Sequence, residues 1–253
     1  MRRIVRYGLL VMGLSCTPLQ AQAEPFLQLD ILGGRYDSTT QTIVSNGPSF
    51  TLVALLTPSG HSTYSPNDTY FISAAISPQV GPTDSSIGSY SWNSNTYSAT
   101  QDMEFGRPPI EGLHDATSDA GDLPSHSIFP TFFNEFGFQF SSSQRAVTYN
   151  TADHPGGLVP TTATTGVSYY RLFNITTSLS GTYQLHFDLY DTFLRNCSRN
   201  RTCTPDEDIN RFAPFSHDAQ SSGSTSVPEP SALLLLAAGL AFGVNYRRRH
   251  SLK

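Results

Sequence analysis

The feature that most constrains the fold of this chain is the alternation of apolar and polar side chains in short segments. In Thr182–Tyr190 every second residue is apolar, namely Tyr183, Leu185, Phe187 and Leu189. This period of two is typical of a strand with one buried face, so we expect His186 and Asp188, on the other face, to be solvated. Helical periodicity is nearly missing between residues 24 and 226, and the pattern therefore predicts an all-β protein.

Several other segments have the length and composition of strands: Phe26–Leu32, Ser49–Leu56, Thr69–Ile76, Phe136–Phe140 and Val167–Ile175. We expect the last of these to pair with Thr182–Tyr190 through a turn at Leu179–Gly181. Many short strands separated by Gly, Pro, Asn and Ser predict a β-sandwich of jelly-roll or immunoglobulin-like type.

The N-terminus has the three parts of a secretion signal. Arg2, Arg3 and Arg6 form a positive region, Tyr7–Leu14 is apolar, and Ala21 and Ala23 provide a small-x-small cleavage site. We therefore expect residues 1–23 to be a signal peptide that a signal peptidase removes, and the mature chain to begin at Glu24.

The C-terminus also has three parts. Val227, Pro228, Glu229 and Pro230 precede an apolar run, Ala232–Val244, and a basic block, Arg247, Arg248 and Arg249, follows it. This tail resembles the PEP-CTERM sorting signal of Gram-negative bacteria, which implies processing by an exosortase-type transpeptidase. The resemblance makes residues 227–253 a sorting signal with a transmembrane segment at 232–246.

An ordinary single-pass anchor is the alternative interpretation of this tail. The stretch from Ser231 to Tyr246 would form roughly 24 Å of helix at about 1.5 Å per residue, against a hydrocarbon core of about 30 Å. A span this short favours a temporary hold in the inner membrane, with the arginines kept in the cytoplasm.

Between the two ends, residues 24–226 form an acidic ectodomain. Its 19 carboxylates, eight arginines and no lysine give a formal charge of −11. Nucleic acid and anionic membrane surfaces bind proteins that present a positive field, so this charge argues against either as a partner of the ectodomain. It is compatible with binding of divalent cations or with solubility outside the cell. We expect one β-sandwich over residues 24–217 and a flexible spacer rich in Ser and Gly over 218–226.

Three phrases of the ectodomain carry a second resemblance: Leu27–Asp37, Phe136–Ser143 and Ala213–Asp218. They resemble the choice-of-anchor domains of bacterial surface proteins, which occur with different C-terminal sorting signals. That family has no assigned activity, so the resemblance implies an exported β-rich body with an exchangeable anchor and no catalytic residues.

Two cysteines, Cys197 and Cys203, remain after signal removal. In an oxidising compartment a pair this close is expected to form a disulfide that closes a surface loop. Metal binding by the pair is less favoured, because no further Cys or His stands at zinc-finger spacing.

A candidate metal site lies in the long loop Glu104–Pro130, where carboxylates gather. Asp115, Asp119 and Asp122 could contribute oxygen ligands to a Ca²⁺ ion, although their spacing matches no EF-hand. A solvated polar loop with no metal, and hence a protein with no cofactor, is the alternative.

A candidate ligand site surrounds the sole tryptophan. Tyr90 and Trp92 could stack on a sugar if they face outward from a hairpin, whereas an inward Trp92 would belong to the core.

No nucleophile elbow, zinc-protease motif or phosphate loop occurs in the chain, so we expect no catalytic residues. Together these features predict an exported surface or exopolysaccharide-matrix protein with a structural or adhesive role. A carbohydrate-binding or calcium-stabilised module, and a secreted polysaccharide or ester hydrolase, are the alternatives.

Overall fold

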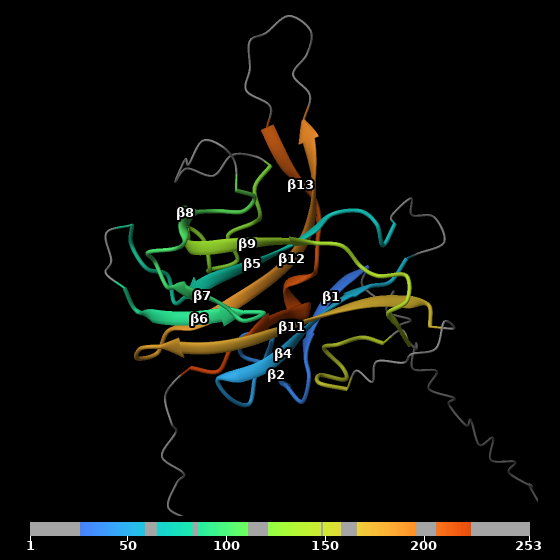
Figure 1. The fold of residues 1–253 in the computed structure, drawn as a ribbon, viewed down its shortest axis with the longest axis horizontal. Helices are drawn as coiled ribbons and strands as arrows, with labels where there is room; N and C mark the ends of the chain where they lie inside the picture. Colours follow the sequence, from blue (N-terminus) through green and yellow to red (C-terminus); the bar gives the residue numbers. More distant parts are fainter. Residues whose placement is uncertain are drawn as a thin grey trace, which may run out of the picture.

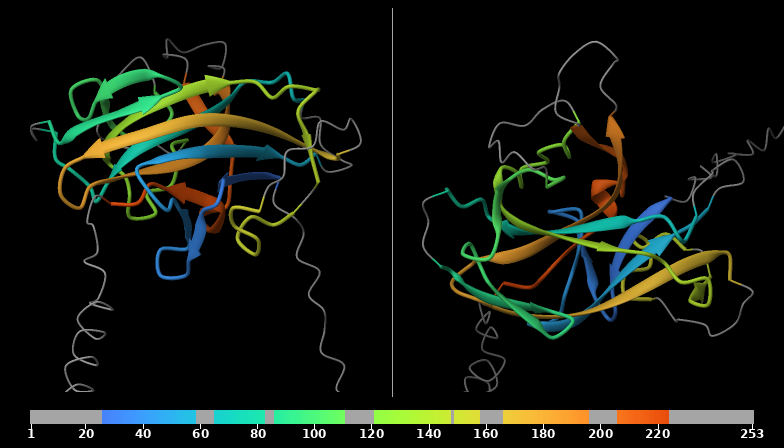
Figure 2. Two further views of the ribbon diagram at one scale, coloured as in Figure 1. Left: turned by 60° about the horizontal axis from the view of Figure 1, so that its bottom comes forward. Right: turned by 45° about the horizontal axis from the view of Figure 1, so that its top comes forward.

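The structure, a computed structural model, describes residues 26–58, 65–82, 86–110, 121–147, 149–157, 166–195 and 206–223. These residues form two β-sheets and one short 3₁₀-helix, η1 (Phe215–His217). The predicted all-β class and the sandwich arrangement are confirmed (Figures 1 and 2).

The first sheet has the strand order β1-β4-β11-β6-β7, and β10 pairs with the start of β11 on the side opposite β4. Its strands are β1 (Leu27–Ile31), β4 (Ser49–Leu56), β6 (Gly88–Trp92), β7 (Asn95–Ser98), β10 (Arg145–Ala146) and β11 (Ser168–Leu179). Each of the described pairings in this sheet is antiparallel.

The second sheet has the order β2-β3-β14-β12-β5-β9-β8, and β13 pairs with the far end of β12. Its strands are β2 (Arg35–Asp37), β3 (Thr42–Val44), β5 (Tyr70–Ser77), β8 (Glu104–Gly106), β9 (Thr131–Phe138), β12 (Gln184–Arg195), β13 (Asp206–Phe212) and β14 (Asp218–Gln220). Figure 1 shows β13 and the end of β12 extending out of the body as a two-stranded arm.

Aromatic side chains from both sheets meet in the core between them. The Trp92 ring of β6 stacks on the Phe136 ring of β9, with centroids 4.1 Å apart. Phe173 of β11 packs edge-on against Phe138 of β9 at 5.1 Å. Contacts of this kind add about 0.5–1.5 kcal/mol each beyond the burial of apolar area, so this row of rings joins the two sheets.

Most predicted strands are found close to their predicted bounds, but Phe136–Phe140 overlaps only the end of β9 (Thr131–Phe138), and one predicted pairing is wrong. Val167–Ile175 and Thr182–Tyr190 belong to β11 and β12, which lie in different sheets. The chain turns through Gly181, whose φ is +62°, and passes from the first sheet to the second. Sequence spacing fits a hairpin and such a crossover equally well, because both need only a short turn between two strands.

The predicted exposure of His186 and Asp188 is also wrong, since each is only 2 % exposed. β12 lies inside the second sheet, between β5 and β14, and its outward face is covered as well. His126, in the loop before β9, lies against that face. Both faces of β12 are therefore buried from Leu185 to Asp191, and the polar side chains on the outward face there need partners within the protein.

The folded body also extends further than predicted. Residues 218–220, which we expected in a flexible spacer, form β14 between β3 and β12. Ser221 is fully buried, and its Oγ accepts a hydrogen bond from the Leu185 amide. The spacer prediction is therefore wrong for these residues, whose backbone hydrogen bonds belong to the sheet.

Candidate functional site

Four titratable side chains meet on the outward face of β12. They are His126 from the loop before β9, His186 and Asp188 from β12, and Asp218 from β14. One possible ligand atom from each residue lies within 4.8 Å of those of the other three. Within the part of the chain that the structure describes, this is the group of His and acidic residues whose geometry could hold a metal ion.

Strand geometry brings three of the four residues together. His186 and Asp188 are two residues apart on β12, so both side chains point to the same face. β14 pairs with β12 at His186 and Phe187, which places Asp218 next to the same face. The fourth residue, His126, is positioned by ring contacts: it stacks on Phe215 at 4.1 Å.

The atoms that converge are two imidazole nitrogens and two carboxylate oxygens. His126 Nε2 lies 3.0 Å from Asp188 Oδ1 and 3.2 Å from His186 Nε2. His186 Nε2 lies 3.4 Å from Asp188 Oδ1 and 3.6 Å from Asp218 Oδ2.

Hydrogen bonds from outside the group fix two of the side chains. His126 Nδ1 lies 2.7 Å from the carbonyl oxygen of Pro124, which can only accept, so Nδ1 donates and Nε2 faces the group. Ser73, opposite Asp188 on β5, donates its hydroxyl hydrogen to Asp188 Oδ2 at 2.8 Å and leaves Oδ1 toward the group.

Burial and charge strongly perturb the group. Burial alone would lower the pKa of His186, but Asp188 and Asp218 outweigh it and raise this pKa to about 10. Burial would raise the pKa of Asp188, yet His186 and His126 hold it well below its usual value. For Asp218, burial and the nearby Asp188 raise the pKa to about 7. Positive charge at the centre of the group would therefore stabilise its two buried carboxylates, and either protons or a bound cation can supply that charge.

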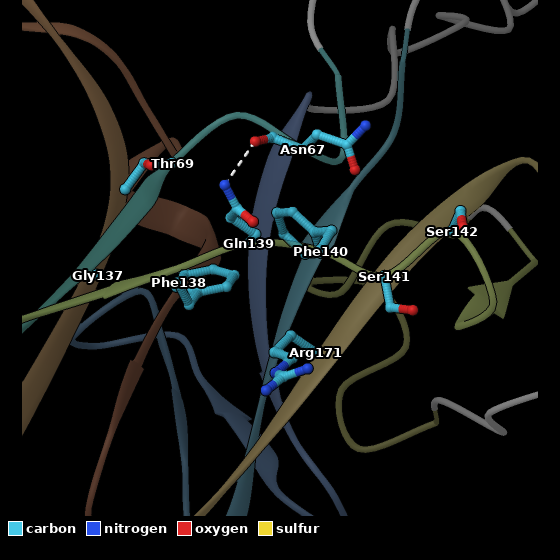
Figure 3. A pocket seen from close by; sticks show the side chains of 9 residues that line it. All are labelled: Asn67, Thr69, Gly137, Phe138, Gln139, Phe140, Ser141, Ser142 and Arg171. Carbon is cyan, nitrogen blue, oxygen red and sulfur yellow. Dashed lines mark hydrogen bonds between the residues drawn. The ribbon is translucent and has the colours of Figure 1, made fainter.

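A second feature is an open depression of about 700 Å³ between the ends of β9 and β11 (Figure 3). Phe138, Gln139, Phe140 and Arg171 are among its lining residues. The Gln139 side chain donates to the Asn67 backbone carbonyl at 2.7 Å, as the dashed line shows, and Arg171 is exposed on β11 of the other sheet. The amide and guanidinium groups can contact the hydroxyl groups of a sugar, and the half-buried Phe138 ring its apolar face, whereas Phe140 is only 3 % exposed and belongs to the core.

The structure places the predicted sugar-stacking residues in the core. Trp92 is 5 % exposed and Tyr90 is 2 % exposed, and the Tyr90 hydroxyl accepts a hydrogen bond from Asn134 at 2.8 Å. The predicted hairpin is present, with Tyr90 opposite Tyr97, but its large rings point inward. The predicted outward aromatic platform at these two residues is therefore wrong, because both rings are buried between the sheets.

The other predicted sites lie largely outside the described residues. This holds for Asp115 and Asp119, for Cys197 and Cys203, and for the signal peptide with Ala21 and Ala23. Asp122 is described and half-buried, so the calcium site stays a prediction. The disulfide stays a prediction too.

Sequence reasoning missed the group around His186. Its members come from three segments up to 92 positions apart, from His126 to Asp218, and match no short motif. The one local signal is a His-x-Asp pair, His186 and Asp188, in a strand that is apolar on its other face. That pair indicates a site only if the strand is buried on both faces, which the sequence did not reveal.

The class of protein follows from the body and the tail together: an all-β sandwich followed by a C-terminal sorting region. The family model of the PEP-CTERM protein-sorting motif matches residues 226–249, which include Val227–Pro230 and Arg247–Arg249. The chain is a PEP-CTERM protein, exported, held transiently at the membrane, and destined for the cell surface or the exterior.

The other comparisons add no relatives. No curated protein and no solved structure matches the chain. The likeness of the ectodomain to choice-of-anchor domains therefore stays a prediction. Among the described residues no helix is long and apolar enough to cross a membrane, and the predicted span at 232–246 lies outside them.

Proposed function

We propose that this protein is a non-enzymatic structural or adhesive component of the cell envelope or the exopolysaccharide matrix. The observation that carries the proposal is the sorting motif at residues 226–249, placed behind an all-β body. On the way a signal peptidase would cut after Ala23, and an exosortase-type transpeptidase would act at Pro228–Pro230. The folded body is then the part that works outside the cell.

The charge of the ectodomain supports a role among polysaccharides. A formal charge of −11 over residues 24–226 keeps the domain dispersed in water and away from anionic surfaces. Neutral sugars remain accessible to it.

A second candidate function, sugar binding, is favoured by the open depression at Gln139 and Arg171. Its lining consists of hydroxyl, amide, guanidinium and aromatic groups together with Gly137, and includes no carboxylate. Cleavage of a glycosidic bond needs two carboxyl groups across the sugar, whereas binding needs donors, acceptors and an apolar face. The lining thus supports adhesion at this place over hydrolysis.

The test is complementation of a deletion strain of the native host. The parent chain is compared with a tail variant that carries Pro228→Ala, Glu229→Ala and Pro230→Ala, which leaves the ectodomain unchanged. We expect the parent to restore protein and polysaccharide in the washed matrix, and the tail variant to leave the protein in the membrane fraction. Full restoration by the tail variant would contradict the proposal.

Two further measurements test the absence of catalysis and the position of the adhesive surface. Purified matrix polysaccharide should keep its length after incubation with the mature protein, and new reducing ends would make the protein a hydrolase. Matrix retention should fall at least severalfold in Arg171→Ala. It should hold in Arg35→Ala, which removes an exposed arginine of β2 outside the lining of the depression.

A further inference from the structure

We propose that His126, His186, Asp188 and Asp218 form a structural binding site for one divalent transition-metal ion of the zinc type. The site is independent of the proposed matrix role. It binds a loop, a central strand and the last strand of the body to one another.

Donor spacing supports this inference. A tetrahedral ion with bonds of about 2.0–2.1 Å holds its ligand atoms about 3.3–3.4 Å apart. Four of the distances among the converging atoms are 3.0, 3.2, 3.4 and 3.6 Å. They scatter around that value, and all four ligand atoms lie within 4.8 Å of one another, so a single ion can touch all four ligands after side-chain adjustments.

The hydrogen positions give a second, independent argument. Because His126 Nδ1 donates to Pro124, a neutral His126 directs its Nε2 lone pair at Asp188 Oδ1. If both histidines carried a proton on Nε2, two N–H groups would face each other at 3.2 Å. A proton shared by one pair leaves the other two ligand atoms without a donor, whereas a central cation attracts all four.

Burial of Asp218 points the same way. It is 1 % exposed, and although His186 Nε2 lies 3.6 Å from Asp218 Oδ2, neither carboxylate oxygen makes a hydrogen bond within the described residues. A buried carboxylate that makes no hydrogen bond is costly, and buried polar atoms are nearly always satisfied. A bound ion would supply the missing partner.

The surroundings resemble the support that metal ligands commonly have. The second nitrogen of His126 donates to a carbonyl, and the second oxygen of Asp188 accepts from Ser73. His186 departs from this pattern, because its Nδ1 is buried and has no hydrogen-bond partner among the described residues.

The ligand types and the closure of the site select the ion and its role. Two imidazoles suit zinc and its neighbours in the first transition row, whereas calcium and magnesium prefer oxygen ligands. The side chain of His126 is 9 % exposed and that of Asp218 is 1 % exposed, which leaves no open position for a substrate. Closed four-ligand sites of this kind are structural.

The experiment measures metal content and thermal unfolding of the mature protein from its native host. We expect about one equivalent of zinc-type metal per chain. Chelation should lower the melting temperature, and free zinc about 100 times above its dissociation constant should raise it again by roughly 5–10 °C. Calcium should not restore it. Cobalt added in place of zinc should give the intense visible absorption of a tetrahedral site.

Three variants assign the metal to these residues. His126→Ala and Asp218→Asn should each lose the metal and the response to chelation, whereas His154→Ala, at an exposed histidine, should keep both. Asp218→Asn preserves side-chain shape, so it reports on binding even if His126→Ala fails to fold. The proposal is overturned by a protein with less than about a tenth of an equivalent and no response to zinc. Retention of metal in Asp218→Asn, or equal rescue by calcium, would also overturn it.

Discussion

Replacement of Trp92 by alanine tests whether the row of aromatic rings joins the two sheets. Trp92 belongs to the first sheet and stacks on Phe136 of the second, with ring planes 7° apart. It also contacts Phe173 at 4.8 Å and, across the core, Phe187 at 6.4 Å. The substitution removes the ring from all three contacts and opens a cavity between the sheets.

The expected magnitude follows from burial and packing. A tryptophan ring that is 95 % buried removes about 150–250 Å² from water, or roughly 4–6 kcal/mol at about 25 cal/mol per Å². Alanine keeps a small part of this, and the measured range for such core truncations is about 3–5 kcal/mol. We expect Trp92→Ala to lower the free energy of unfolding by about 4 kcal/mol. Trp92→Phe, which keeps a ring, should cost about 1–2 kcal/mol.

Urea unfolding followed by far-ultraviolet circular dichroism is the suitable assay, because both variants lack the sole tryptophan and its fluorescence. Phe193→Ala serves as the matched control, since this ring is 47 % exposed and its loss should change stability by less than about 1 kcal/mol. If Trp92→Ala unfolds within 1 kcal/mol of the parent, the ring does not hold the sheets together. In that case the assignment of Trp92 to the core would be refuted.

Three further predictions concern single side chains. Burial raises the pKa of Asp30 to about 6 despite hydrogen bonds from Tyr149, Gly156 and Ile31, so its contribution to stability is full below about pH 4 and is lost as the pH rises through 6. Urea unfolding at pH 4 and pH 7 should therefore show Asp30→Asn gaining up to about 2–3 kcal/mol relative to the parent over that window, and a constant difference would contradict the assignment. Gly88 has φ +121°, and a Cβ added there would clash with the Ser178 carbonyl oxygen, so Gly88→Ala should lower the free energy of unfolding by at least about 2 kcal/mol in thermal unfolding. Gly181→Ala, at φ +62° in open space, should lower it by about 1 kcal/mol. Equal losses in the two variants would refute the close approach at Gly88. Tyr190→Phe removes the hydroxyl that donates to Glu135 at 3.0 Å, so it should lower the free energy of unfolding in urea by more than about 0.5 kcal/mol. A smaller loss would show that this buried hydrogen bond is not formed.

Local pattern predicted the strands because a period of two depends only on neighbours in sequence. Ser49–Leu56 is found with its predicted bounds as β4, and the core face of β12 is the predicted one. Strand pairing could not be predicted from this local pattern, because it depends on which of the two sheets a strand joins after a turn. The crossover from β11 to β12 is the clearest example.

The candidate metal site depends on the same missing information. His186 and Asp188 resemble a solvated face until β14 and the loop at His126 are placed over them. The outward sugar platform at Trp92 failed for the related reason that facing direction follows from sheet packing. The sorting tail, in contrast, is a linear motif, so it could be identified from the sequence without knowledge of the fold.

The measurement that tests the central claim most directly is the intact mass of the mature protein from fractions of its native host. The account predicts a chain that begins at Glu24, ends near Pro230, and is found in the matrix or the medium. A chain that still carries Arg247–Lys253 and stays in the inner membrane would contradict it, and the protein would then be a membrane-anchored periplasmic domain.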